Sequence, residues 1–364
     1  MKFTVERLKL QKALQRVGNI IGSRSMLPLL GNVLINAGEN GLELTTTDLE
    51  LRLVTRVEAE VSEGGITTLP AKKLASLVSS FSGEMVEFDI NDKDFARITC
   101  GTAKFTLLGL SAADFPEALA FDPVETITIK ESVFKRMIGS ISYAVSADDS
   151  RKVLTGILLS LRDNAMTLVA TDGKRMAMQE AAPDSVTGAD ANSIIPLKAM
   201  VELRRQLEGD ETLTIEVGEK LCRFTCSGVI LTSKLIEGAY PNYRQVVPSK
   251  FSREVELPVS ALLSKIETVA LMIAGVNSSI ILRFADNQLQ LQASSAEVGE
   301  GSDILETEFS GEPFEVSFNP VFLADPLRNT DADMVRFKLN DPLSPVAIEA
   351  GEGFIYIIMP IRKK

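Results

Sequence analysis

The strongest constraint on the fold is a unit of roughly 120 residues that occurs three times in the 364-residue chain. "LELTTTDLELRL" and "MTLVATDGKRMA" are alternating apolar runs that lead into Thr-Asp, at Asp48 and Asp172, 124 residues apart. "LQLQASSAEV" has Ser294 and Ser295 in the corresponding place. Self-similarity at a fixed period indicates a repeated structural unit.

Two further landmarks follow the same period. A proline opens a helix-like run at Pro70, Pro196 and Pro320, at spacings of 126 and 124 residues. The first two units also close alike, with "LSAADFPE" and "LIEGAYPNY". These landmarks predict three domains, at residues 1–121, 122–248 and 249–364.

Each unit contains two copies of a short strand, a helix and several alternating strands. In the first helix, Leu10, Leu14 and Val17 form one apolar stripe. The strands are short and antiparallel by pattern, which predicts an α+β fold and argues against a doubly wound parallel sheet. Pro326 is expected to kink or shorten the last helix. The six expected helices are residues 7–18, 71–81, 131–142, 197–208, 259–272 and 320–330.

The composition narrows the possible chemistry. There is no histidine, which removes Ser-His-Asp and Cys-His catalysis and histidine metal sites. The three cysteines without a secretory signal predict reduced structural thiols in a cytosol. No apolar run is long enough for a membrane helix, and no signal peptide is recognised, so no membrane association is expected.

The net charge of −11 argues, taken alone, against nucleic acid. The six expected helices, however, contain thirteen basic and five acidic residues, a net charge of +8. Such a distribution suits a ring whose helices attract phosphate without reading sequence, while the acidic remainder repels stray DNA. The plainer alternative is that these charged helix faces are merely solvated.

The chain resembles the bacterial DNA sliding clamps, the beta subunits of the replicative DNA polymerase III holoenzyme. The resemblance covers the whole chain, through "MKFTVER", "LPLLGNVLI", "TTTDLELRL", "TLPAKKL", "LSAADFP", "LVATDGKRMAM", "LTSKL", "YPNYRQVVP", "FNPVFL" and "YIIMPIR". It implies three clamp domains, each with two inner helices and antiparallel outer sheets, that close into a ring as a head-to-tail homodimer.

The same resemblance implies a function. The ring would encircle double-stranded DNA without sequence preference and act as a non-catalytic processivity factor in the cytoplasm. Its partners would be the polymerase alpha subunit, the clamp loader, other polymerases and repair proteins, held through short peptide motifs. No cofactor and no metal are implied.

Three sets of site residues follow from the resemblance. A partner-peptide cleft is formed by Leu154, Thr171, Gly173, Lys174, Arg175, Met176, Pro241, Val246, Phe322, Met359, Pro360, Ile361 and Arg362. For DNA, Arg24 matches a family position that faces the duplex, and further candidates for the contact are Lys72, Arg151, Lys152, Lys198, Arg204 and Arg205. The dimer interface is expected at Lys73, Lys104, Phe105, Leu107, Leu271, Met272, Glu297 and Glu300.

Some positions depart from the family pattern or have a plainer interpretation. Lys174 stands where the family commonly has histidine, and Lys363 and Lys364 extend the chain beyond Arg362. Asp172 recurs as Asp48, which favours a turn former over a catalytic acid. Lys174 and Arg175, which follow Asp172 in the same turn, predict a cationic rim for the cleft.

The sequence disfavours two alternatives to this kind of clamp. A nucleotide or phosphoester enzyme on a repeated α+β scaffold is disfavoured by the missing histidine, phosphate loop and metal cluster. A trimeric clamp of the archaeal and eukaryotic kind has two domains per chain, whereas three repeats per chain close the same ring as a dimer.

Overall fold

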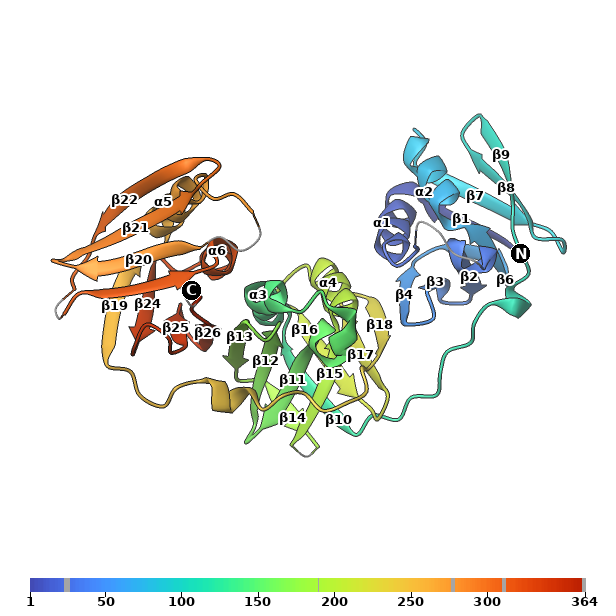
Figure 1. Ribbon diagram of the computed structural model, residues 1–364. Helices are drawn as coiled ribbons and strands as arrows, with labels where there is room; N and C mark the ends of the chain where they lie inside the picture. Colours follow the sequence, from blue (N-terminus) through green and yellow to red (C-terminus); the bar gives the residue numbers. More distant parts are fainter. Residues whose placement is uncertain (23–26, 189, 276–278, 310–311, 362–364) are drawn as a thin grey trace. The chain divides into compact units, whose positions relative to one another are not determined.

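The computed structural model describes residues 1–22, 27–188, 190–275, 279–309 and 312–361. These residues form six α-helices, five 3-10 helices and twenty-six strands (Figure 1). All strand pairs among them are antiparallel, which confirms the α+β class. The chain divides into two compact units. Unit 1 is Met1–Ser132, Asp184–Gly188 and Lys198–Leu235, and unit 2 is Val133–Pro183, Ala189–Leu197 and Ile236–Lys364.

Unit 1 contains two sheets. The five-stranded sheet has the order β5-β1-β7-β8-β9, and the nine-stranded sheet the order β14-β10-β16-β17-β18-β4-β3-β2-β6. The strands of the smaller sheet are β1 (Lys2–Glu6), β5 (Glu60–Glu63), β7 (Met85–Ile90), β8 (Phe95–Cys100) and β9 (Ala103–Leu108). Those of the larger sheet are β2 (Asn32–Gly38), β3 (Gly41–Thr47), β4 (Leu51–Val57), β6 (Gly65–Pro70), β10 (Glu125–Lys130), β14 (Ser185–Thr187), β16 (Thr212–Val217), β17 (Leu221–Cys226) and β18 (Val229–Lys234).

Unit 2 also contains two sheets. The eight-stranded sheet has the order β15-β11-β12-β13-β26-β25-β24-β19, and the four-stranded sheet the order β22-β21-β20-β23. The larger sheet consists of β11 (Gly156–Arg162), β12 (Ala165–Thr171), β13 (Arg175–Ala181), β15 (Ala191–Pro196), β19 (Arg253–Pro258), β24 (Met334–Leu339), β25 (Val346–Glu349) and β26 (Phe354–Ile358). The smaller one consists of β20 (Ile280–Ala285), β21 (Gln288–Ser295), β22 (Gly299–Glu306) and β23 (Phe314–Phe318).

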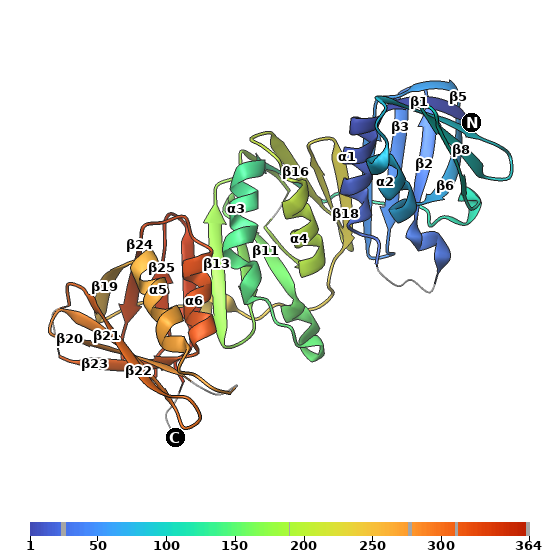
Figure 2. The same cartoon turned by 90° about the horizontal axis from the view of Figure 1, so that it is seen from above.

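The helices cover the sheets through their apolar stripes. The stripe predicted for the first helix is buried, with Leu10, Leu14 and Val17 at most 2% exposed. α1 and α2 lie side by side, as do α5 and α6 (Figure 2). The α-helices are α1 (Arg7–Gly18), α2 (Ala71–Ser80), α3 (Glu131–Ile141), α4 (Leu197–Gln206), α5 (Val259–Ala270) and α6 (Pro320–Arg328). The 3-10 helices are Pro28–Gly31, Ala112–Asp114, Ser142–Ala144, Asp149–Thr155 and Tyr243–Val246.

Two helices end before their predicted boundaries for visible reasons. α4 stops at Gln206, because the backbone N–H groups of Glu208 and Gly209 donate to the buried carboxylate of Glu131 at 3.0 and 3.2 Å. α5 stops at Ala270, because Leu271 N–H bonds to the Thr268 carbonyl three residues back, as in a tightened last turn. α2, α3 and α6 also end one or two residues early.

The repeat is visible in how neighbouring domains share sheets. In unit 1, β18 pairs with β4, and in unit 2, β26 pairs with β13. The register is the same at both junctions. Val229 lies opposite Thr55, Phe354 lies opposite Gln179, and Thr55 and Gln179 are equivalent positions in the repeat. Each junction is therefore an antiparallel pair of strands, one from each of two neighbouring domains, that joins their sheets into one larger sheet.

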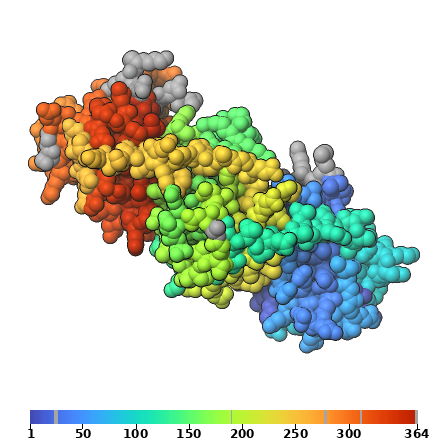
Figure 3. Space-filling model, turned by 90° about the horizontal axis from the view of Figure 1, so that it is seen from below, coloured from blue at the N-terminus to red at the C-terminus, as the bar shows by residue number. Residues whose placement is uncertain are grey.

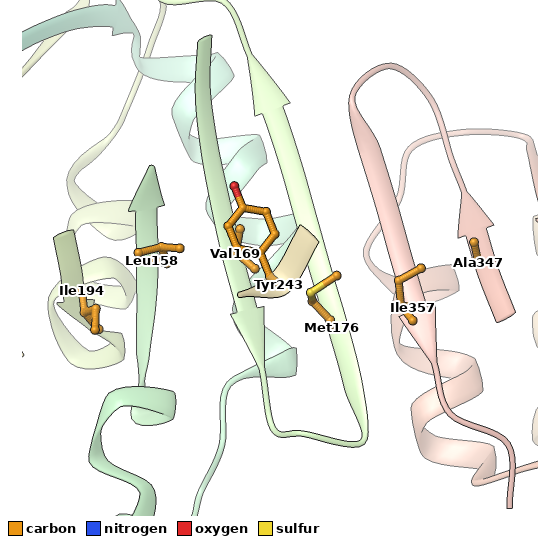
Figure 4. Close-up of a cluster of buried hydrophobic side chains, with 7 residues drawn as sticks. All are labelled: Leu158, Val169, Met176, Ile194, Tyr243, Ala347 and Ile357. Carbon is orange, nitrogen blue, oxygen red and sulfur yellow. The ribbon is translucent and has the colours of Figure 1, made fainter. Parts of the chain in front are cut away.

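A connecting segment, residues 236–252, covers the large sheet of unit 2. It runs along the surface as the gold segment in Figure 3. Tyr243 is buried against the sheet in a cluster with Leu158, Val169, Met176 and Ile357 (Figure 4). Ile236, Tyr240, Val247 and Phe251 pack beside it. The segment thus closes one apolar face of this sheet.

Candidate functional site

The "TDGKRM" sequence folds as a hydrogen-bonded turn between β12 and β13. Asp172 Oδ1 accepts from the backbone N–H groups of Lys174 and Arg175 at 2.9 and 3.0 Å. Thr171 Oγ1 donates to the Arg175 carbonyl at 2.6 Å and accepts from Gly173 N–H at 3.1 Å. Thr171 Oγ1 and Asp172 Oδ1 therefore hold the backbone of the turn through four hydrogen bonds.

The turn of the first repeat has the same hydrogen bonds. Asp48 Oδ1 accepts from Glu50 and Leu51 N–H at 3.0 and 2.7 Å, and Thr47 Oγ1 donates to the Leu51 carbonyl at 2.7 Å. Asp172 and Asp48 are therefore both turn formers, as the repeat predicts. The third residue has a positive φ in each turn, 84° at Gly173 and 76° at Leu49.

Arg175 is buried rather than displayed at a rim. It is 9% exposed. Its guanidinium donates to Asp172 Oδ2 at 3.1 Å, to the Tyr143 carbonyl at 2.7 Å and to Asp325. Burial acts to lower the pKa of Arg175, but Asp325 and Tyr356 together raise it above its ordinary value. The expectation that Arg175 contributes to a cationic rim is wrong, because the side chain is buried and its Nε, Nη1 and Nη2 donate to acceptors inside the protein.

The C-terminal strand continues alongside this turn. Met359 N–H donates to the Lys174 carbonyl at 3.0 Å, and Ile361 N–H donates to the Ser317 carbonyl at 2.8 Å. Met359 is 42% exposed, and Pro360 and Ile361 are half-buried. These contacts bring two of the predicted cleft segments, the turn and residues 359–361, into direct contact.

The other predicted cleft residues lie at different depths in unit 2. Met176 and Leu154 are buried, at 2% and 6% exposure. Phe322, in the first turn of α6, has its ring 4.2 Å from the Arg175 guanidinium. Val246 is 42% exposed, and Pro241 is exposed too, both on the connecting segment. Arg362 lies outside the described residues.

The residues expected to meet DNA differ in how free their charges are. Lys198 pairs with Asp48, Arg151 with Asp148 at 3.3 Å, and Arg205 with the buried Glu202 at 3.2 Å. Within the part of the chain that the structure describes, Lys72, Lys152 and Arg204 are exposed and form no ion pair. Arg24 is not among the described residues. The predicted helix charge is thus partly neutralised within the protein.

Most of the residues expected at the dimer interface lie on or near two edge strands, whereas Lys73 lies on α2. Phe105 and Leu107 are on β9, at one edge of the small sheet of unit 1, and Phe105 is 45% exposed. β22 is an edge of the small sheet of unit 2. Leu271 beside it is 71% exposed, and Met272 packs against Gly301 of β22, where an added Cβ would lie 2.8 Å from Met272 Cγ. Lys73, Lys104, Glu297 and Glu300 are exposed.

The remaining polar candidates form no reaction centre in the described residues. Cys100, Cys222 and Cys226 are free and buried, and burial raises the pKa of the Cys226 thiol to about 12. No group of three or more Cys, Asp or Glu residues in the described ranges could hold a metal ion. Among the same residues, no helix is long and apolar enough to span a membrane.

Comparisons with known proteins agree along the entire chain. Three family models match, the N-terminal domain of the DNA polymerase III beta subunit at residues 1–120, its central domain at 128–242 and its C-terminal domain at 244–362. The "Beta sliding clamp" of Salmonella typhimurium is 33% identical, and that of Chlamydia muridarum 31%, each covering 100% of this chain and 99% or more of the relative.

A solved structure gives the same result. The sliding clamp of Pseudomonas aeruginosa bound to griselimycin matches with a TM-score of 0.96 and 31% identity over 100% of both chains. The enzyme alternative finds no support among these relatives. The chain therefore belongs to the bacterial beta sliding clamps, a family of three-domain, ring-forming, non-catalytic processivity factors of DNA polymerase III that encircle DNA during replication.

Proposed function

We propose that the "TDGKRM" turn, Phe322, the connecting segment and residues 359–361 form the cleft that receives short peptide motifs of replication proteins. The observation that carries this proposal is the hydrogen bond from Met359 N–H to the Lys174 carbonyl, which leaves the apolar side chain of Met359 42% exposed beside the turn. An exposed, anchored methionine suits adaptable binding of several partners.

The proposed partners are the polymerase alpha subunit, the clamp loader, other polymerases and repair proteins, which would exchange at this one cleft in the cytoplasm. A short apolar peptide buries few side chains and loses its own conformational freedom on binding. Its dissociation constant is therefore expected to be micromolar, which corresponds to a binding free energy on the order of −8 kcal/mol. Exchange among partners requires such weak binding.

The test is a calorimetric titration of the intact protein with a synthetic peptide that has one Glu beside a Leu-Phe pair. Met359→Asp is expected to abolish binding, because it places a charge on the apolar wall. Val321→Asp is the matched control, since Val321 is also an exposed apolar side chain of unit 2, at 55%, and is not assigned to the cleft. Unchanged binding by Met359→Asp would move the peptide site elsewhere.

We also propose how the ring closes. In the repeat, β4, β13 and β22 are equivalent strands, and so are β18, β26 and β9. Two of the three possible pairs already exist within the chain, β4 with β18 and β13 with β26. Among the described strands, β22 and β9 each lie at the end of a sheet. The outer edges of β22 in one copy and β9 in another are the remaining pair, and an edge strand is a template for a second chain.

The repeat also gives the register of this joint. By analogy with Leu53 opposite Leu231, Phe105 would lie opposite Gly301, and Thr106 opposite Glu300. Gly301 has no side chain, so the Phe105 ring can reach Met272 beneath it. Lys104 would lie diagonally across from Glu300, within reach of a long side chain. The joint thus combines an apolar contact with complementary charges. The same three-fold repeat also supports our proposal that the domains are residues 1–121, 122–248 and 249–364.

For DNA, we propose that the exposed cations Lys72, Lys152 and Arg204 contact phosphates directly. Lys198, Arg151 and Arg205 would do so only by sharing their charge with Asp48, Asp148 and Glu202, and Arg24 completes the proposed set. These side chains offer charge without base-reading geometry, which fits sequence-independent binding.

A further inference from the structure

Two adjacent cations in the "TDGKRM" turn have opposite environments. Arg175 is 9% exposed, and its Nε, Nη1 and Nη2 donate to Asp172, Asp325 and the Tyr143 carbonyl. Lys174 is exposed and forms no ion pair within the described ranges. Only one of the two charges is therefore available to a molecule that arrives from outside.

Arg175 also holds α6 at two points. Asp325 and Phe322 are three residues apart, on the same side of this helix. Asp325 accepts a hydrogen bond from the guanidinium, and the Phe322 ring lies 4.2 Å from it, in a cation–π contact. Because Asp172 holds the same guanidinium from the turn, Arg175 connects the turn to the wall that Phe322 provides.

A guanidinium that donates to three separate acceptors and lies over an aromatic ring fixes the geometry of its surroundings as well as stabilising them. The planar fork of arginine matches two carboxylates and an aromatic face at once, and lysine cannot reproduce it. The guanidinium keeps its charge, because Asp325 and Tyr356 raise its pKa despite burial. Arg175 is buried, and its Nε, Nη1 and Nη2 already donate to acceptors inside the protein, so an acidic group of a peptide would compete with Asp325 and Asp172 for it.

We propose that Arg175 is a positioning residue of the partner-peptide cleft, which sets the Phe322 wall against the turn, and that Lys174 is the cation that selects an acidic residue in the peptide. This inference rests on the proposed peptide cleft. It assigns different tasks to two neighbouring cations that the sequence alone presents as equivalent.

The first test does not require a peptide. The chain contains no tryptophan, so Phe322→Trp introduces a single fluorescent reporter at the wall. In this background, Asp325→Asn and Arg175→Lys are expected to increase acrylamide quenching of the introduced tryptophan, because the wall loses its anchor. Lys174→Gln is the matched control and should leave quenching unchanged. Equal quenching in all four proteins would overturn the positioning role.

The second test is a double-mutant cycle without the reporter. A peptide with one Glu beside a Leu-Phe pair and its Glu→Gln twin are titrated into the native protein, Lys174→Gln, Arg175→Lys and Asp325→Asn. The preference for Glu over Gln should vanish in Lys174→Gln and persist in the other two. Asp325→Asn should weaken both peptides alike, by roughly five- to tenfold.

The outcomes separate the two proposals. If the Glu preference vanishes in Arg175→Lys and persists in Lys174→Gln, Arg175 is the peptide ligand and the inference is wrong. If Met359→Asp leaves both peptides bound, the cleft itself is misplaced, which is a failure of the proposed function. If Met359→Asp abolishes binding but Asp325→Asn changes neither affinity nor quenching, the cleft stands and the positioning role falls.

Discussion

Tyr356 donates its hydroxyl hydrogen to the carbonyl oxygen of Phe322 at 2.7 Å. In a regular helix that carbonyl would accept from the N–H four residues later, at position 326, which is a proline and has none. Tyr356, on β26, supplies the missing donor from outside the helix. α6 therefore continues past Pro326 to Arg328, although at nine residues it is the shortest of the six described α-helices.

This relationship predicts non-additive stabilities. Tyr356→Phe leaves the Phe322 carbonyl without its donor and is expected to lower the free energy of unfolding by about 1–3 kcal/mol. Pro326→Ala restores a backbone N–H at the helical position. In the Pro326→Ala background, Tyr356→Phe should therefore cost clearly less, as measured by urea denaturation of the four proteins. Additive costs would mean that the carbonyl is satisfied in another way.

The two repeated turns give a matched pair of substitutions. Gly173→Ala should destabilise the protein by at least about 1 kcal/mol, because φ is 84° and the added Cβ would lie 2.9 Å from Arg151 Nη1. Leu49 already has a φ of 76° with its side chain 45% exposed. Leu49→Gly should change the free energy of unfolding by less than about 0.5 kcal/mol. The glycine relieves backbone strain in the folded state, but it also makes the unfolded chain more flexible, and the two effects offset each other. Thermal unfolding of both variants decides this.

Local pattern was enough to predict most of the fold. The Thr-Asp repeat predicts two turns that share their side-chain hydrogen bonds, and the stripe of Leu10 and Leu14 predicts the buried face of α1. Both signals depend on residues near one another in the chain. Helix ends were less predictable, because the one at Gln206 depends on the carboxylate of Glu131, 75 residues earlier.

The candidate site shows the same limit. The sequence presents Lys174 and Arg175 as two adjacent cations, and their spacing predicts a cationic rim. The structure buries Arg175 against Asp325, which is 150 residues away in the sequence. A pattern of neighbouring residues cannot predict a contact between residues so far apart in the chain. Lys198 likewise pairs with Asp48 across 150 residues. Counting charges along a helix therefore overestimates how many are free for phosphate.

DNA binding should be topological. The intact protein is expected to stay on nicked circular DNA once loaded and to slide off when the circle is cut, whereas short linear duplex should bind weakly and without sequence preference. Sequence-specific retention on a short linear site would contradict the ring.

Two neighbours on α4 test which charges meet the phosphates. Arg204→Gln should reduce the slope of log affinity against log salt by about 0.9, because one fewer counterion is released. Arg205→Gln should reduce it less, since Arg205 already pairs with Glu202 at 3.2 Å. Equal slopes in the two variants would show that internal pairing does not decide the contact.

The ring joint can be tested at two places. Leu271→Asp should give folded monomers, because the dimer would bury an unpaired charge at each of its two joints, at a cost of about 1–3 kcal/mol or more per joint. Sedimentation at micromolar concentration measures this. Leu343→Asp is the matched control, since Leu343 is an exposed apolar residue of unit 2, at 58%, outside the proposed contacts. A dimeric Leu271→Asp protein would remove this residue from the interface.

The register of the joint has its own test. If β9 and β22 repeat the pairing of β18 with β4, Thr106 and Glu300 lie directly opposite, with a Cα separation of about 5 Å that a disulfide can span. Thr106→Cys combined with Glu300→Cys should therefore form covalent rings on mild oxidation, which denaturing electrophoresis detects as dimers. Thr106→Cys with Ser302→Cys is shifted by two residues and should cross-link poorly, because side chains on that diagonal lie about 7–8 Å apart. The native thiols do not interfere, since all three are buried. Efficient cross-linking of the shifted pair alone would show that the third junction has a different register from the two inside the chain.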